Sequence, residues 1–367
     1  MMAQYEFISE NGGKFVADAE PVSLGQGTGR IEVIRDCNYC EFLYNDTEPR
    51  LFVAESISRN LRPLLSLAKG FIFKSGDNLN HFSNVIRYND IPACISEELW
   101  NIAVQNEHKQ LKLKSKHVPK IHTAYQNLYS AFCENIEKCE LQIPIIKVQT
   151  QFPQKLSNKV LSVNQLLYLG YPVPRSVILS GLENSIFDVS EILQSTPCRF
   201  TSADKLMVRP SLCGGSGINR HTSGLMSSKT VSGIEQLSAQ LTGYQQACAH
   251  LSKKYKESYQ LSVLIQDYIP TQSNGVMFTR IPWDYSAERF ILQLSSKNGL
   301  QKYNQACHNR DINGNMVLKK VIEACFELSN YFSIPLEVEF VISENNDIYF
   351  VQFRPVFVDN KECTHHD

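Results

Sequence analysis

The sequence predicts a two-domain chain of mixed α/β and α+β class. Its 367 residues, 43% of them hydrophobic, are enough for two packed cores. Within residues 1–100, short apolar runs alternate with helical segments, which is typical of a small layer of strands and helices. Within residues 148–360, amphipathic helices separate further strands, and the last two strands alternate with a period of two. We therefore expect a small domain followed by a larger one.

Composition and charge exclude several classes of protein. The formal net charge is −1, so no basic excess indicates nucleic acid. No apolar run approaches membrane-spanning length, and the N-terminal residues lack the apolar segment of a signal peptide. The 11 scattered cysteines, an odd number, favour free thiols in a reducing compartment. We therefore expect a cytoplasmic protein with no nucleic-acid or membrane partner.

Three local patterns are weak signals for a metal or a nucleic acid. Cys37 and Cys40 form a CxxC pair, but no second pair exists to complete four zinc ligands. His117 and His122 have a zinc-like spacing but lie far along the chain. The basic residues 109–120 have no interleaved aromatic residues, so we interpret them as a solvated linker face.

The first domain is predicted as a β-α-β-α-β layer. Gly25, Gly27 and Gly29 form a turn-rich stretch before its first strand. We expect strands over residues 30–34, 51–54, 70–73 and 91–95, and helices over residues 60–69 and 81–89. Residues 97–145 contain few glycines and many Lys, Gln and Glu, which predicts helical structure. This region is either a hinge or an ordinary helical packing element.

His81 is the most informative residue of the first domain. It stands between the polar turn of residues 75–80 and a predicted helix start, where backbone N–H groups are unpaired. Such a position suits an imidazole that carries a phosphoryl group. A loop histidine is also commonly an ordinary surface residue, so the flanking residues must decide between the two interpretations.

The residues around His81 resemble a known phosphohistidine motif. The matching residues are His81, Ser83, Arg87, Ile91, Pro92 and Ala93. They resemble the motif of the mobile domain in phosphoenolpyruvate synthase and pyruvate phosphate dikinase, where an arginine and a Gly-Ile-Pro-Ala turn follow the histidine. Here Asp90 replaces the glycine, and Leu79 and Asn80 replace small hydroxyl residues. The resemblance implies a swivelling domain in which His81 accepts a phosphoryl group and Arg87 stabilises it.

The second domain opens with a helix, a glycine stop and a strand. Ser157 to Ser180 contains these elements, with Gly170 and Pro172 marking the helix end. The predicted strand Lys205–Val208 then leads through Arg209 into a loop that contains Gly214, Gly215 and Gly217. Glycines allow backbone N–H groups to approach an anion, and arginine pairs with phosphate in a bidentate way. The remaining predictions are helical structure over residues 233–259 and 316–332, and strands over residues 261–269, 275–279, 336–342 and 348–353.

The last two predicted strands form a hairpin with two different faces. If residues 344–347 form the turn, Ser343 pairs with Ile348. One face then carries two polar cross-strand pairs, Glu339 with Gln352 and Glu337 with Arg354. The other, buried face carries Val338, Phe340, Val351 and Phe353. An exposed charged face explains this alternation by itself, and the alternative is a carboxylate and an amide directed at a magnesium–nucleotide complex.

Four segments of the second domain resemble the ATP-grasp nucleotide-binding domain of the same dikinase family. They are the Lys159 helix with Pro172-Val173-Pro174, Val208-Arg209 with Ser211, Gln266 with Pro270 and Gly275–Thr279, and the closing hairpin. The resemblance implies that ATP is contacted by Lys159, Arg209, Ser211, Gln266, Glu339, Gln352 and Arg354, with Glu339 and Gln352 also contacting Mg²⁺. Pro210 and Ile281 replace polar residues of the family motifs.

The resemblance implies a swivelling phosphohistidine domain followed by an ATP-grasp domain, the reverse of the order in the best-known members. The predicted ranges are 1–100 for the swivelling domain, 101–147 for a helical linker or hinge, 148–360 for the ATP-grasp domain and 361–367 for a tail.

The main functional hypothesis is a dikinase-like phosphotransferase. It moves a phosphoryl group from ATP to His81 and on to an unidentified small-molecule or protein acceptor, and similarity implies AMP and phosphate as products. Two alternatives stay open. One is an ATP-grasp ligase that activates a carboxylate, for which His81 is dispensable. The other is a degenerate nucleotide-binding scaffold, which Pro210 and Ile281 favour.

Overall fold

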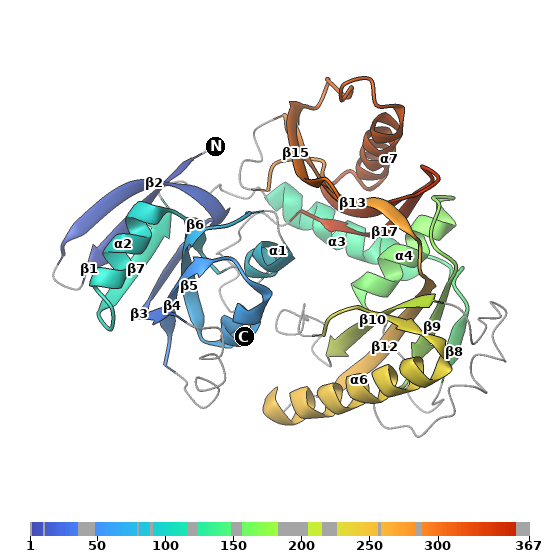
Figure 1. The fold of residues 1–367 in the computed structure, drawn as a ribbon, viewed down its shortest axis with the longest axis horizontal. Coiled ribbons are helices and arrows are strands. Elements are labelled where there is room, and N and C mark those ends of the chain that lie inside the picture. The colour runs from blue at the N-terminus through green and yellow to red at the C-terminus, as the bar shows by residue number, and fades with distance from the viewer. Residues whose placement is uncertain are drawn as a thin grey trace.

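The structure is a computed structural model, and the residues that it describes form one closed barrel and two five-stranded sheets (Figure 1). It describes residues 2–9, 12–35, 48–78, 81–88, 91–115, 123–147, 156–182, 205–214, 226–255, 258–282 and 288–356. The predicted CxxC pair, both linker histidines, Gly215, Gly217 and the tail lie outside these residues. Within the described part of the chain, no helix is long and apolar enough to cross a membrane.

The N-terminal part of the chain forms the closed barrel. Its strands are β1 (Ala3–Ser9), β2 (Lys14–Ser23), β3 (Gln26–Ile34), β4 (Arg50–Ser56), β5 (Ala68–Ser75), β6 (Ala93–Ile95) and β7 (Gln110–Ser115). Their order is β1-β2-β6-β5-β4-β3-β7, and β7 closes the barrel by pairing with both β1 and β3. The predicted strands of the first domain are thus confirmed as β3, β4, β5 and β6, while β1 and β2 come from residues for which no element was predicted.

Helices cover both faces of the parallel strands β3 to β6. The 3₁₀ helix η2 (Arg59–Ser66), over the predicted helix 60–69, and α1 (His81–Tyr88) share one apolar cluster with Phe71 and Phe73. In that cluster Phe82 of α1 meets the ring of Phe71 edge to face at 5.8 Å. Helix α2 (Glu97–Gln105) packs through Leu99 into the cluster inside the barrel. The start of α1, and so the backbone of His81, is therefore fixed to a rigid sheet.

Gly27 shows why the barrel needs glycine at the start of β3. A Cβ atom at this position would lie 1.6 Å from the carbonyl oxygen of Lys69, which belongs to β5. No side chain fits into that approach, because backbone atoms cannot swing aside as a flexible side chain can. Gly25, just before β3, has a φ of +135°, which also favours glycine. The turn-rich glycines of the sequence are thus explained by close packing of the backbone.

The predicted helical region over residues 101–147 is partly wrong, because it contains two strands. Within β7, Leu111 and Leu113 are buried inside the barrel while Lys112 and Lys114 stay accessible, which is the period-two pattern of a strand. The barrel therefore extends past the predicted boundary at residue 100. The region also supplies α3 (Thr123–Lys138) and β8 (Ile145–Lys147), which both belong to the second part of the molecule.

The second part of the molecule begins with a mixed sheet, called sheet B here. Its strands are β8, β9 (Ser176–Ser180), β10 (Lys205–Gly214), β11 (Lys229–Ser232) and β12 (Tyr259–Asp267), in the order β11-β10-β12-β9-β8. The long helix α6 (Gly233–Tyr255) packs through Leu237 and Leu241 onto Val208 and Val263 of this sheet. One face of sheet B is thus an apolar core, and the opposite face is left for other contacts.

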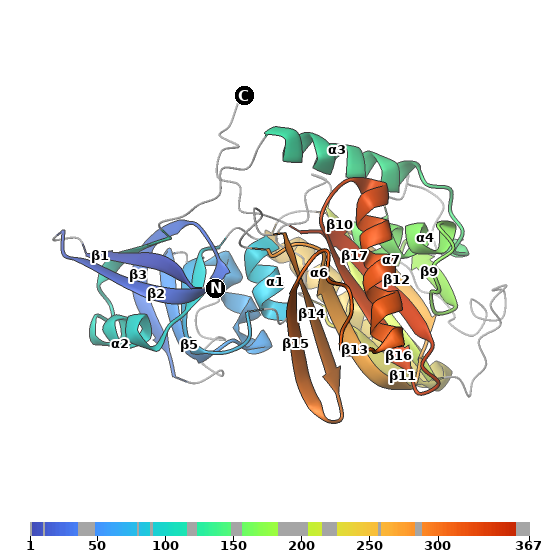
Figure 2. The ribbon, with the colours of Figure 1, turned by 90° about the horizontal axis from the view of Figure 1, so that it is seen from above.

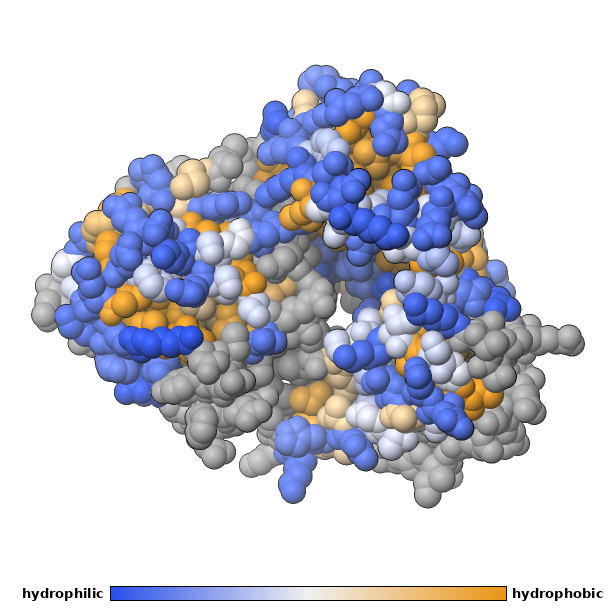
Figure 3. Space-filling model, in the orientation of Figure 1, coloured by the Kyte–Doolittle hydropathy of each residue, from blue (hydrophilic) through white to orange (hydrophobic). Residues whose placement is uncertain are grey.

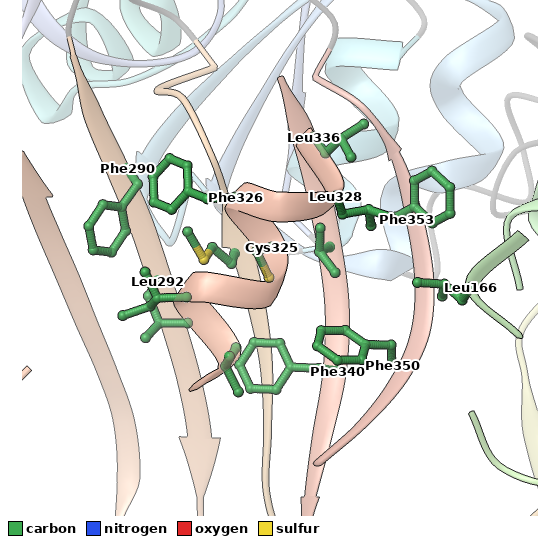
Figure 4. Packing of buried hydrophobic residues seen from close by; sticks show 14 of the residues in the cluster. Leu166, Phe290, Leu292, Cys325, Phe326, Leu328, Leu336, Phe340, Phe350 and Phe353 are labelled. Carbon is green, nitrogen blue, oxygen red and sulfur yellow. The ribbon is translucent and has the colours of Figure 1, made fainter. Parts of the chain in front are cut away.

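The other sheet of this part, called sheet C, is antiparallel throughout. Its strands are β13 (Thr271–Phe278), β14 (Arg289–Ser296), β15 (Gly299–Ala306), β16 (Leu336–Ser343) and β17 (Ile348–Pro355), in the order β15-β14-β13-β16-β17. Helix α7 (Met316–Phe332) lies along one face of sheet C, as predicted for residues 316–332 (Figure 2). Cys325 and Leu328 of α7 pack there against Phe340 and Phe353 (Figure 4).

Helix α4 (Asn158–Tyr168) joins the cores of sheets B and C. Its Leu161 and Leu166 belong to the apolar cluster of sheet C. Its Val160 and Val163 belong to a separate cluster with Leu264 of sheet B. Because one helix is buried against both sheets, sheets B and C are held in a defined relation to each other.

Candidate functional site

Arg209 and Ser211 lie on the face of sheet B that is opposite to α6. Their neighbours Val208 and Leu212 point into the α6 core, and side chains alternate along a strand. The Nε atom of Arg209 is enclosed and has no hydrogen-bond partner among the described residues. Burial lowers the pKa of this guanidinium, and the negative charge of Glu339 opposes that shift. An enclosed, unpaired N–H group is costly, so this position suits a bound acceptor such as a phosphate oxygen.

Glu339 and Gln352 are cross-strand partners on β16 and β17, as the sequence predicts. The predicted pairing of Ser343 with Ile348 is wrong, because Ile342 takes that place. A β-bulge between Glu339 and Phe340 absorbs the difference of one residue and restores the predicted pairs. Because of this bulge, Phe340 pairs with Phe350 and not with Val351, the partner that the predicted register gives. Phe350 then belongs to the core between sheet C and α7.

Arg354 is engaged by the carboxylate of its cross-strand partner, Glu337. Its Nε donates to Glu337 Oε2 at 3.0 Å and its Nη2 donates to Glu337 Oε1 at 2.7 Å. Both side chains are largely buried, with 18% of Arg354 and 6% of Glu337 exposed. A bidentate ion pair of this kind gives Arg354 a role within sheet C. The nucleotide contact that the resemblance implies for Arg354 stays a prediction.

The N-terminus of α4 lies beside Ser211. Ser157 is the N-cap of this helix, and its Oγ accepts a hydrogen bond from the Val160 N–H. The same Oγ is hydrogen-bonded to Ser211 Oγ on β10. Lys159 lies in the first turn of α4 and is half-buried. The end of a helix that attracts anions therefore lies at the same sheet face as Arg209. Ser157 was not predicted as a site residue, although an N-cap serine before an apolar helix is visible in the sequence.

Gln266 lies on the same face of sheet B but is fully enclosed. It pairs with Met207 in the ladder between β12 and β10, two residues from Arg209. Its Nε2 donates to Ser176 Oγ on β9 at 3.0 Å. The described contact ties neighbouring strands together, and the predicted contact of Gln266 with a nucleotide stays a prediction.

The residues present fit a magnesium ion bound through phosphate oxygens. Within the described residues, no group of three or more His, Cys, Asp or Glu side chains is arranged to hold a metal. Glu339 and Gln352 offer one carboxylate and one amide oxygen next to each other. Mg²⁺ usually keeps several waters and needs only one or two protein carboxylates when substrate phosphates complete its ligands. The enclosed Nε of Arg209, a residue on whose pKa the charge of Glu339 acts, is the observation that favours a phosphate at this place.

In the barrel, Arg87 holds the turn that precedes His81. Its Nη1 donates to the carbonyl oxygens of Val22 at 2.8 Å and Asn78 at 2.7 Å, and it is buried. Ser83 Oγ donates to the carbonyl oxygen of Asp77 at 3.0 Å. Two residues of the predicted phosphohistidine motif thus fix the backbone ahead of His81. Stabilisation of a phosphoryl group by Arg87 stays a prediction.

This turn of the barrel touches sheet C. Gln293 Nε2 of β14 donates to Asp77 Oδ2, and Lys302 Nζ of β15 donates to Asn78 Oδ1 at 3.0 Å. The guanidinium of Arg87 lies 6.0 Å from the ring centroid of Phe278 on β13. Both ribbon views show α1 on the side of the barrel that faces the second part of the molecule, and Figure 2 shows it next to β14 and β15 (Figures 1 and 2). The surface is hollowed between the barrel and the two sheets (Figure 3).

The two residues of sheet C that contact the turn, Gln293 and Lys302, belong to the same row of side chains across the sheet as Glu339. The cross-strand pairs of that row connect Lys302, Gln293, Val276, Glu339 and Gln352. Two strand spacings separate Gln293 from Glu339, which is roughly 10 Å. His81 follows Asn78 by three residues, a chain reach of at most about 10 Å. The structure therefore places the Asp77–Asn78 turn, which precedes His81 in the chain, on the face of sheet C that carries Glu339.

No family model and no curated protein matches the chain. Solved structures are similar over about half of it. A D-alanine-D-alanine ligase from Coxiella burnetii is 11% identical, over 56% of this chain and 49% of its own, with a TM-score of 0.32. The macrocyclase MdnC from Microcystis aeruginosa MRC, bound with precursor peptide MdnA, is 13% identical, over 54% and 51%, with a TM-score of 0.32. The ATP-grasp ligase PsnB, complexed with a minimal precursor, is 9% identical, over 56% and 53%, with a TM-score of 0.31.

The chain spans only about half the length of each of these three structures. Two of them are named as ligases and one as a macrocyclase. None of the three is named as a phosphoenolpyruvate synthase or a pyruvate phosphate dikinase.

Proposed function

We propose that the chain is an ATP-dependent phosphotransferase that binds Mg²⁺-ATP between sheets B and C and phosphorylates His81. The observation that carries this proposal is the contact of the Asp77–Asn78 turn with sheet C, in the row of side chains that contains Glu339. This turn precedes His81 in the chain, so its contact with sheet C holds the start of α1 on the face that carries the proposed metal ligand. In this proposal the barrel is the swivelling domain, and sheets B and C form an ATP-grasp-type domain.

The proposed ATP contacts come from β10, helix α4 and the β16–β17 hairpin, and they include Arg209 with its enclosed Nε atom. Arg209 and Lys159 would neutralise phosphate oxygens, and Ser211 would act beside the N-terminus of α4. Glu339 and Gln352 would hold Mg²⁺, which when bound neutralises charge on the phosphate oxygens. Catalysis in such a site is mainly positioning and charge neutralisation, so no further acid or base is required from the protein.

The proposed reaction at His81 is a substitution at phosphorus. A nitrogen of the neutral imidazole, whose usual pKa is near 6.5, attacks the phosphorus atom. The nitrogen–phosphorus bond forms at the β-phosphorus of ATP while the bond from that phosphorus to the AMP oxygen breaks, and the electron pair leaves with AMP. Water then cleaves the terminal phosphate from the pyrophosphoryl group, so that phosphate is released and His81 keeps one phosphoryl group. A small molecule or a partner protein then takes the phosphoryl group from His81. Similarity to the dikinase family implies AMP and phosphate as the products from ATP.

An ATP-grasp ligase is the second candidate. In this case the carboxylate of a second substrate, and not His81, accepts the phosphoryl group from the same Mg²⁺-ATP site. The motivation is the names of the solved structures, which include ligases and a macrocyclase described with precursor peptides. The two candidates differ in the group that accepts the phosphoryl group, so an experiment that follows this group separates them.

The deciding experiment follows the phosphoryl group from ATP labelled at the β or γ position. We expect an acid-labile label on the wild-type protein that is absent from His81→Ala, while calorimetry gives the same ATP affinity for both. His250→Ala, which removes an exposed histidine from α6, is the matched control and should keep the label. Full multiple turnover by His81→Ala, dependent on an added acid and amine, would instead establish the ligase. Binding of ATP without any turnover would indicate a scaffold.

A further inference from the structure

The contact between the barrel and sheet C is made by side chains with defined polar partners. Asn78 is fully buried, although it lies in a turn. Its Nδ2 donates to the Pro21 carbonyl oxygen at 3.3 Å inside the barrel, and its Oδ1 accepts from Lys302 Nζ on sheet C. Asp77 accepts from Gln293 in the same way. Both residues next to the predicted phosphohistidine motif therefore use their side chains to reach the other part of the molecule.

On sheet C, Gln293 and Lys302 are neighbours on adjacent strands. They are cross-strand partners on β14 and β15, so their side chains leave the sheet on one face. Gln293 is 9% exposed, which is low for a glutamine on a sheet face. Lys302 also lies 3.9 Å from the carboxylate of Glu20 on β2, so one cation faces two acceptors of the barrel.

We propose that Gln293 and Lys302 are positioning residues that receive the Asp77–Asn78 turn and so bring His81 to the phosphoryl donor. This inference rests on the proposed function. The shared row of side chains leads from Lys302 and Gln293 to Glu339, the proposed metal ligand. A shift of the turn along this row by one strand would change the distance from His81 to the donor by roughly 5 Å, too much for in-line transfer.

The composition of the contact also suits release. More than a third of the side chains of Lys302 and Glu20 is exposed, so water and salt weaken their attraction. A phosphoryl group that passes from His81 to another acceptor requires the turn to leave the ATP site. Because each polar contact between the turn and sheet C is weak, the barrel can leave sheet C and return to it.

The test uses the full-length chain and reverses charges across the contact. Lys302→Glu and Glu20→Lys remove the attraction singly, and the double variant restores an opposite-charge pair. Lys297→Glu is the matched control, because it makes the same charge change in the turn of the same β14–β15 hairpin. Among the described residues, the Lys297 side chain has no contact with the barrel. Single-turnover labelling of His81 reports the reaction. Small-angle X-ray scattering reports whether the barrel stays on sheet C, independently of any chemistry.

We expect Lys302→Glu to slow labelling of His81 by roughly tenfold or more, because orientation is lost. Its ATP affinity should match the wild type, its scattering should show a larger radius of gyration, and the double variant should regain part of the rate. Lys297→Glu should behave as the wild type. A Lys302→Glu protein with the wild-type labelling rate overturns the positioning role alone. Wild-type protein that never acquires label on His81 overturns the proposed function and this role together.

Discussion

The ion pair between Glu337 and Arg354 provides a sharp test of the structure of sheet C. Arg354→Met removes the two hydrogen bonds that the guanidinium donates to the Glu337 carboxylate. Glu337 is only 5% exposed, so its charge stays buried in the variant. Removing one partner of a buried pair typically costs about 3–5 kcal/mol, because the other charge stays buried without compensation. Since 18% of the Arg354 side chain is exposed, we expect a loss near the lower end, about 3 kcal/mol.

The double variant Glu337→Leu/Arg354→Met distinguishes a structural role from a nucleotide contact. With both charges replaced by apolar groups, stability should return to within about 1 kcal/mol of the wild type. Urea unfolding followed by circular dichroism measures the change, and hydrogen exchange of the β16 amides locates it. Glu344→Gln, in the exposed hairpin turn, is the control. A double variant as unstable as Arg354→Met refutes this reasoning. A stable double variant that no longer binds ATP would show that Arg354 contacts the nucleotide.

Three further predictions concern the site and the barrel. Arg209→Ala should weaken ATP binding in calorimetry by about 1.5–3 kcal/mol, because a charged hydrogen-bond donor to phosphate is lost. Glu339→Gln should abolish Mg²⁺-dependent turnover and leave the urea midpoint of unfolding unchanged. Phe340→Ala should instead lower the free energy of unfolding by about 3–5 kcal/mol, because Phe340 is buried. The opposite pattern would mean that the two faces of β16 are exchanged. Gly27→Ala should prevent folding of the barrel as seen by circular dichroism, while Gly243→Ala, in open space on α6, should be tolerated.

The sequence predicts elements with a strong apolar pattern and fails where that pattern is short or mixed with charge. The bounds of helix α7 are predicted correctly, since apolar residues recur at helical spacing and seven of its side chains are buried. Strand β7 is missed, because lysines alternate with only two leucines and lysine is depleted in strands. The closing pairs of the hairpin are predicted correctly from the alternation, but the bulge at Glu339 is not, since no turn or glycine signals it.

The candidate site is predictable in part because its residues belong to recognisable segments. Arg209 and Glu339 come from separate segments that the resemblance connects, and the fold places them close enough for the charge of Glu339 to act on the pKa of Arg209. The contact of Gln293 with Asp77 joins residues 216 positions apart, and no local pattern marks either side chain. Such contacts depend on how the parts of the molecule pack together. For the same reason the sequence could not show that Arg354 is already paired within its sheet.

The seven-stranded barrel has a practical consequence for dividing the chain. A closed barrel has no free strand edges, whereas an open sheet exposes unpaired backbone groups that attract other chains. A fragment that ends at residue 100, the boundary suggested by the sequence, would lack β7 and expose edges of both β1 and β3. Such a fragment should self-associate. A fragment that ends just after Ser115 keeps the ring of hydrogen bonds closed and should remain monomeric, so that it can be supplied to the separate remainder of the chain as a phosphoryl acceptor.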